Sequence, residues 1–87
     1  MLPTDFAIVV GMEGHHVAVA VSGRLDAETA TRVRDVIVGI LRTGHRHLVV
    51  DLPTVGSIDS RGLQILVQAL RRCRSQGGEL TFRFAAA

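Results

Sequence analysis

The chain has 87 residues, which is enough for one small domain, and its hydrophobic share of 47% excludes a disordered polymer. Its formal net charge is only +2 although its pI is near 10, because every basic residue is arginine and lysine is absent. The arginines are spread along the chain among eight acids, and Trp and Tyr are absent, so the sequence argues against direct nucleic-acid binding.

The single cysteine, Cys73, excludes an internal disulfide and favours a reducing, cytoplasmic setting. The N-terminal stretch has no basic region and its apolar run is too short for a signal peptide. The apolar runs elsewhere fall far below the ~20 residues that span a bilayer. We therefore expect a soluble cytoplasmic protein without a membrane span.

Two strands are predicted first, Phe6–Val10 and His16–Ser22, joined as a hairpin by the turn residues of "GMEG". In the second strand Val17, Val19 and Val21 share one face and two alanines share the other. Because both faces are apolar, this pattern predicts a strand that is buried on both sides.

A helix is predicted to follow, with Asp26 as its N-cap and Gly44 just beyond its end. Its apolar residues recur at helical spacing: Ala30, Val33, Ile37, Ile40 and Leu41. Leu48–Val50 then reads as a short core strand that Pro53 stops.

A second helix is indicated by the apolar stripe Leu63, Leu66, Val67, Leu70 and Cys73, and Gly77 marks its end. We predict that this stripe faces the sheet. In the last segment Leu80, Phe82 and Phe84 alternate with Glu79, Thr81 and Arg83, which is typical of a strand with one wet face.

The predicted order is β-β-α-β-α-β. Right-handed crossovers place both helices on the same face of the sheet. The fold class is therefore α/β: a small two-layer sandwich with a mixed four-stranded sheet, formed by residues 1–87 as a single domain.

The sequence does not argue for an enzyme. His45 and His47 could share a strand face and hold a metal, but no acid or cysteine completes the site, so we expect strand-edge histidines and no metal. Cys73 lies on an apolar stripe and is expected to be a core residue rather than a nucleophile. The glycines form no nucleotide-binding motif, and no cofactor is predicted.

The row Asp59, Ser60, Arg61 and Gly62 stands where the second helix is predicted to begin. Asp59 or Ser60 would cap the helix. Capping alone does not explain a cation in the first turn, where the helix dipole disfavours it, nor a glycine inside the helix. The row is either a cap alone or a cap combined with a partner-binding surface.

The stretch "LVVDLPTVGSIDSRGLQILVQALRRCRSQGGEL" resembles the central signature of STAS domains of the bacterial anti-sigma factor antagonist type, and "VAVSGRLDAETATRVRDVI" is similar to the strand–helix segment that precedes it. The resemblance implies a domain that binds an anti-sigma factor, which is a serine-protein kinase, and so frees a sigma factor and regulates transcription. On this resemblance the partner-binding residues are Asp59, Ser60, Arg61 and Gly62, with Asp26 of the "GRLD" turn nearby.

Two features depart from the family pattern. The family's phosphoacceptor position is occupied by Arg61, so either Ser60 or Ser57 serves as the acceptor, or this chain is not phosphorylated. The usual C-terminal helix and strand after Glu79–Phe84 are also missing from this sequence.

The shorter C-terminus would leave Leu80, Phe82 and Phe84 with less cover, which predicts concentration-dependent self-association or tight dependence on a partner. Two alternatives stay open: a STAS accessory subunit of a transport or stressosome-type assembly that is not phosphorylated, and a degraded copy that folds poorly.

Overall fold

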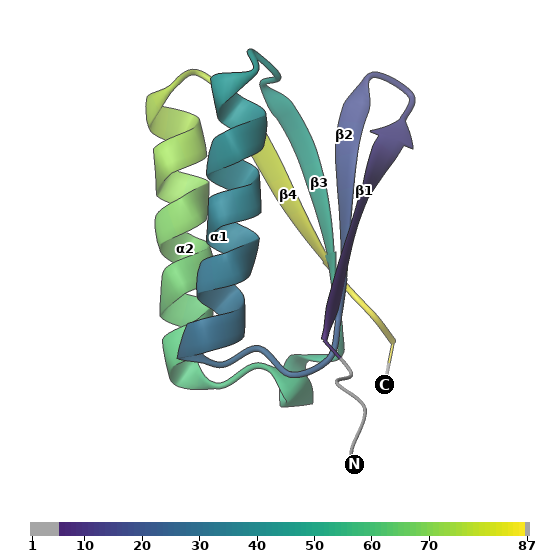
Figure 1. Ribbon diagram of the computed structural model, residues 1–87, viewed down its shortest axis with the longest axis vertical. Coiled ribbons are helices and arrows are strands. Elements are labelled where there is room, and N and C mark those ends of the chain that lie inside the picture. Colours follow the sequence, from purple (N-terminus) through teal and green to yellow (C-terminus); the bar gives the residue numbers. More distant parts are fainter. Residues whose placement is uncertain (1–5, 87) are drawn as a thin grey trace.

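Figure 1 shows the computed structural model of the protein, which describes residues 6–86. A four-stranded sheet forms one layer, and two helices side by side cover one face of it. The elements in chain order are β1 (Ala7–Glu13), β2 (His16–Ser22), α1 (Ala27–Arg42), β3 (His47–Leu52), the short 3-10 turn η1 (Val55–Ser57), α2 (Ser60–Ser75) and β4 (Glu79–Phe84). The predicted fold class is confirmed.

The strands are ordered β1-β2-β3-β4 across the sheet. β1 and β2 form the predicted antiparallel hairpin, while β2–β3 and β3–β4 are parallel pairs. The hairpin turn begins later than predicted: of the four residues "GMEG", only Gly14 lies in the turn, and the first three belong to β1. Gly11 pairs with Ala18 inside the ladder, and the chain reverses only at Gly14, whose φ of +62° suits glycine.

The core lies between the sheet and the two helices. Among its fully or nearly fully buried side chains are Val17, Val19 and Val21 of β2, Leu48, Val50 and Leu52 of β3, Leu80 of β4, Ala30, Val33, Ile37 and Leu41 of α1, and Leu66, Ala69 and Cys73 of α2. Burial of β2 on both sides was a wrong prediction: Ala18 is half-buried and Ala20 is exposed. The reason is that both helices lie on the same face, so that the alanine face of β2 has no second layer against it.

The predicted core stripe of α2 is also partly wrong. Leu63 is 49% exposed, and Val67 and Leu70 are only half-buried. The residues that α2 buries are Gly62, Leu66, Ala69 and Cys73. Three of these are small, which lets α2 pack closely against its neighbours, and the consequence is a rotation that turns Leu63 toward solvent.

Arg83 of β4 holds an ion-pair network that the sequence analysis did not anticipate. Its Nε donates to Asp51 Oδ1 at 2.6 Å, and its Nη1 and Nη2 donate to the Glu13 carboxylate at 3.0 and 2.9 Å. These hydrogen bonds hold the pKa of both carboxyls below their ordinary values. Because Glu13 belongs to β1, one side chain links the two edge strands of the sheet.

The apolar side chains of β4 are better covered than expected: Leu80 is buried, Phe82 is half-buried, and only Phe84 is exposed. The other edge strand, β1, exposes Val9, Val10 and Met12. Self-association stays a prediction, and β1 offers it the more apolar edge.

We predict that Leu66→Ala lowers the free energy of unfolding by about 2–5 kcal/mol, because Leu66 is 1% exposed in the core. The matched control is Leu63→Ala one turn earlier on the same helix, which should cost less than about 1 kcal/mol since half of that side chain already meets water. Urea unfolding followed by circular dichroism measures both. Equal losses for the two variants would show that α2 is rotated differently.

Candidate functional site

The caps of the two helices lie at one end of the molecule, below α1 and α2 in Figure 1. Asp59 caps α2, and its Oδ1 accepts the backbone N–H of Gly62 at 2.8 Å. Asp26 caps α1 as predicted, exchanging hydrogen bonds with Thr29, and these bonds lower the pKa of Asp26. The choice between Asp59 and Ser60 as the cap is therefore settled in favour of Asp59.

Leu25 joins these two caps. Its N–H donates to Ser57 O at 2.9 Å, and its carbonyl oxygen accepts the N–H of Asp59 at 3.0 Å, so that Leu25 and Ile58 form a parallel bridge. The side chain of Leu25 is buried. The "GRLD" turn thus lies directly against the start of α2, as expected for loops that follow parallel strands.

The contact with the backbone of Leu25 requires a glycine at position 62. A Cβ at position 62 would collide with the carbonyl oxygen of Leu25 and stand 2.9 Å from its carbonyl carbon. The close approach that a glycine permits is therefore made by the chain's own loop. Gly62 is buried and acts by positioning α2, while its neighbours Asp59, Ser60 and Arg61 are exposed.

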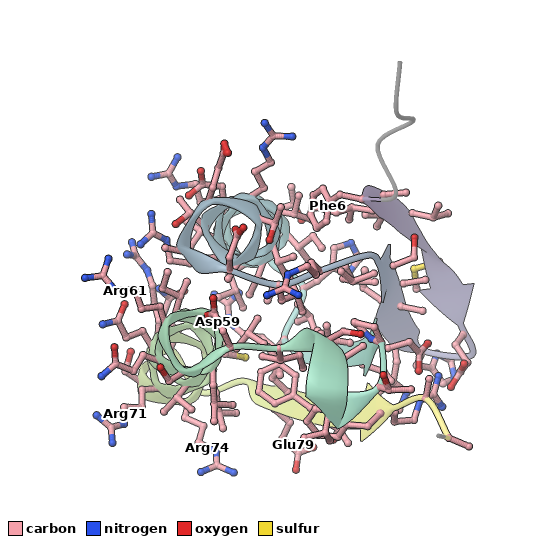
Figure 2. The ribbon with its side chains drawn as sticks, turned by 90° about the horizontal axis from the view of Figure 1, so that it is seen from below. Phe6, Asp59, Arg61, Arg71, Arg74 and Glu79 are labelled. Atoms are coloured by element: carbon pink, nitrogen blue, oxygen red, sulfur yellow. The ribbon has the colours of Figure 1, made fainter. Side chains whose placement is uncertain are left out.

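Ser60 and Arg61 begin α2 at the surface. The Ser60 hydroxyl makes no hydrogen bond, and Arg61 makes no ion pair, with any residue between 6 and 86. In Figure 2 the arginine side chain extends outward from the first turn of the helix. By contrast, the Ser57 hydroxyl lies 3.3 Å from the Thr54 hydroxyl, and Ser57 is half-buried. Of the two serines considered as acceptors, Ser60 is the more accessible.

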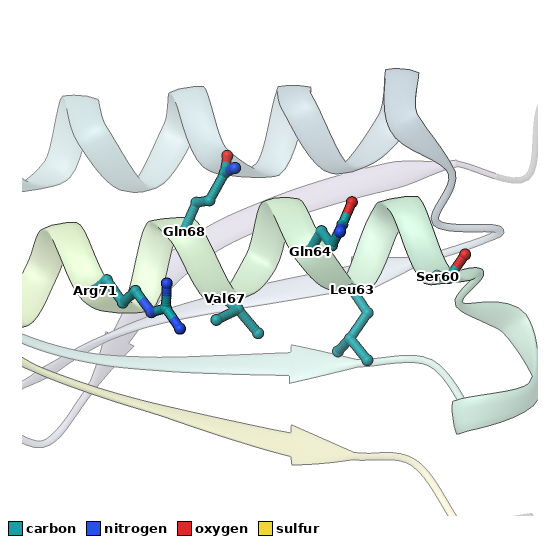
Figure 3. A pocket seen from close by; sticks show the side chains of 6 residues that line it. All are labelled: Ser60, Leu63, Gln64, Val67, Gln68 and Arg71. Atoms are coloured by element: carbon teal, nitrogen blue, oxygen red, sulfur yellow. The ribbon is translucent and has the colours of Figure 1, made fainter.

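The exposed face of α2 carries a surface groove of about 600 Å³, lined by Ser60, Leu63, Gln64, Val67, Gln68 and Arg71. Figure 3 shows Leu63 and Val67 on one side of the helix and Gln64 and Gln68 on the other. We call these six residues the α2 face. An apolar pair within a polar rim is typical of a protein-docking surface.

Sequence reasoning missed the α2 face because it placed Leu63 and Val67 in the core. The signal that could have found it is Gly62. If a helical glycine faces inward, then residues 66, 69 and 73 follow it on the same side, and Leu63 and Val67 are left outside.

The other candidates show no reactive arrangement. Within residues 6–86, no group of three His, Cys, Asp or Glu side chains is placed to hold a metal ion. The Nδ1 atom of His47 instead lies 3.3 Å from Glu79 Oε1, where β3 and β4 begin. Cys73 is fully buried, as predicted, and burial raises the pKa of its thiol.

The helices of residues 6–86 are too short or too polar to cross a membrane.

Comparison with known proteins shows that the chain is similar to a protein family and to solved structures. A family model described as "Mlab, STAS domain" matches residues 8–87. A solved structure described as "Crystal Structure Analysis of Mglu" has a TM-score of 0.70 and 26% sequence identity to this chain, and the match covers 86% of this chain and 19% of that chain. This chain thus corresponds to about a fifth of that protein. A search among curated proteins finds no match.

We predict that Gly62→Ala destabilises the fold by about 1–3 kcal/mol, because the added methyl must push α2 away from Leu25. Gly39→Ala is the matched control: this glycine is also inside a helix, and a Cβ there meets nothing within 4 Å. The control should gain about 0.5–1 kcal/mol from better helix propensity. Chemical denaturation measures both changes, and a gain in both variants would contradict the Leu25–Gly62 contact.

Proposed function

Since the chain belongs to the STAS family by the match over residues 8–87, we propose that it is a non-enzymatic interaction domain that acts as an anti-sigma factor antagonist. It binds an anti-sigma factor of the serine-kinase type and thereby releases a sigma factor for transcription. The observation that carries this proposal is the α2 face, which presents Leu63 to solvent beside the cap that the family signature contains.

The chemistry of the α2 face supports a protein partner. Leu63 and Val67 lie one helical turn apart, and together they form an apolar centre that an approaching protein can cover. Fully burying a leucine is favourable by about 1.5–3 kcal/mol, and about half of this is still available at Leu63. Arg71 and the glutamines around the pair can hydrogen bond at the rim.

A second candidate function is that of a STAS accessory subunit in a transport or stressosome-type assembly, bound permanently and not phosphorylated. The observation that favours it is Arg61, which stands at the family's acceptor position and offers a fixed charge in place of a hydroxyl. Both candidates use the α2 face. They differ in whether the partner is a sigma-binding kinase and in whether the complex responds to ATP.

The first experiment uses complexes of an anti-sigma factor with its sigma factor, purified from the organism that encodes this chain. Adding the chain should release the sigma factor, as measured by size-exclusion chromatography. Leu63→Asp should abolish release, because it places a charge at the apolar centre of the α2 face. Val9→Asp, which alters a 65% exposed valine on β1, should release sigma as the wild type does. Failure of the wild type with every anti-sigma factor would contradict the antagonist function and favour the accessory subunit.

The second experiment asks whether a phosphate switch exists. With the cognate kinase and radiolabelled ATP, wild type should incorporate little or no phosphate, since arginine cannot accept it. Arg61→Ser should become labelled, because a hydroxyl in the first turn of a helix is favourably placed for a phosphate group. Ser60→Ala is the control. Stoichiometric labelling of wild type that Ser60→Ala removes would instead make Ser60 the acceptor.

A further inference from the structure

The two layers of the molecule carry different charges. α2 contains Arg61, Arg71, Arg72 and Arg74 and no acidic residue. On the sheet, by contrast, each carboxylate has a neighbour within the chain: Glu13 and Asp51 share Arg83, and Glu79 Oε1 lies 3.3 Å from His47 Nδ1. Figure 2 shows nitrogen-tipped side chains fanning out from the helical side of the molecule. The helical layer is therefore the cationic surface of the protein.

A groove of about 460 Å³ runs between the two helices on this surface. α1 contributes Arg34, Asp35, Val38 and Arg42 to its lining, and α2 contributes Gln68, Ala69 and Arg72. We call it the interhelical groove. Three guanidinium groups thus line one groove together with a single carboxylate, and that carboxylate, Asp35, lies 3.4 Å from Arg34.

Arg42 and Arg72 have no ion pair with any residue between 6 and 86. Both stand in the last turn of their helices, where the helix dipole favours a cation. That explains why an arginine suits each position alone. Arg34, in the middle of α1, adds a third guanidinium to the groove, and its ion-pair partner among residues 6–86 is the exposed Asp35.

The residues that line the groove indicate which class of anionic partner can bind there: a lipid bilayer, a nucleic acid or an acidic protein segment. The exposed large apolar side chains of the described part of the chain are Val9, Val10, Met12, Val55, Leu63 and Phe84, and none of them lines the groove. The groove therefore lacks the large apolar side chains that would insert into a bilayer. The lining also contains no aromatic ring on which a base could stack. The half-buried Val38 instead offers a small apolar contact for the methylene groups of glutamate.

We propose that the interhelical groove binds an acidic segment of a partner protein, whose carboxylates pair with Arg34, Arg42 and Arg72. A guanidinium binds a carboxylate through two parallel hydrogen bonds, which makes arginine rather than lysine the suitable cation. Gln68 lines both this groove and the α2 face, so the two surfaces are continuous. One partner can cover both, and only this last point rests on the proposed function.

The test uses a fluorescein-labelled oligoglutamate peptide and fluorescence anisotropy at low salt. Wild type should bind the peptide, and added salt should weaken binding. Arg42→Glu/Arg72→Glu should weaken binding by about tenfold or more, because it reverses two of the three cations in the groove. Arg24→Glu/Arg74→Glu changes the net charge by the same amount outside the groove and should weaken binding by about twofold at most.

Arg42→Gln/Arg72→Gln keeps the test valid if the acidic variant unfolds, and it should also bind more weakly than the control. Leu63→Asp should still bind the peptide. Peptide binding by the groove is therefore tested independently of sigma release. Equal weakening by the groove variant and the control would overturn the proposal. It would also be overturned if single-stranded oligonucleotide or phosphatidylglycerol vesicles bound the groove arginines more tightly than oligoglutamate.

Discussion

The backbone contact between Leu25 and the start of α2 is the constraint on which the rest of the structure depends. Leu25 donates to Ser57 and accepts from Asp59, and the missing side chain at Gly62 lets the two backbones meet. This contact ties the loop after β2 to the loop after β3 and fixes how α2 is rotated about its axis. With Gly62 against Leu25, Leu66 must point into the core, and Leu63 must point away from it.

The elements and their order could be predicted because each depends on residues that are close in sequence. Periodicity identified both helices, and the Asp26 cap, the Pro53 stop and the alternation in β4 required no distant contact. The rotation of α2 could not be predicted in this way, since two apolar stripes overlap on that helix and Gly62 chooses between them through Leu25, 37 residues away. The Arg83–Glu13 pair joins residues 70 apart and left no local pattern. Within the candidate site, the helix cap could be predicted from the sequence. The α2 face could not, because its exposure depends on the same rotation of α2.

The residues of the family signature fall into two groups, those that hold the helix ends in place and those that are exposed on the surface. Asp26 and Asp59 hold helix ends, and Gly62 admits the loop, so these residues keep the site in place. Ser60, Arg61, Leu63 and Val67 lie on the surface beside these caps, and we propose that they contact the partner. The charge follows the same division: Glu13 and Asp51 on the sheet are paired with Arg83, whereas Arg42, Arg61 and Arg72 on the helices have no ion pair with any residue between 6 and 86. Both observations support our proposal that a partner docks on the helices.

The central claim, that a partner docks on the α2 face, is tested most directly by site-specific photocrosslinking in the native host. A photoreactive phenylalanine analogue replaces Leu63 in one variant and Thr81, on the sheet, in another, and both variants must melt cooperatively. Position 63 should crosslink to one protein that carries a serine-kinase-type ATP-binding domain, and position 81 should not. Equal crosslinking of that protein from both positions, or crosslinking from position 81 alone, would contradict the claim.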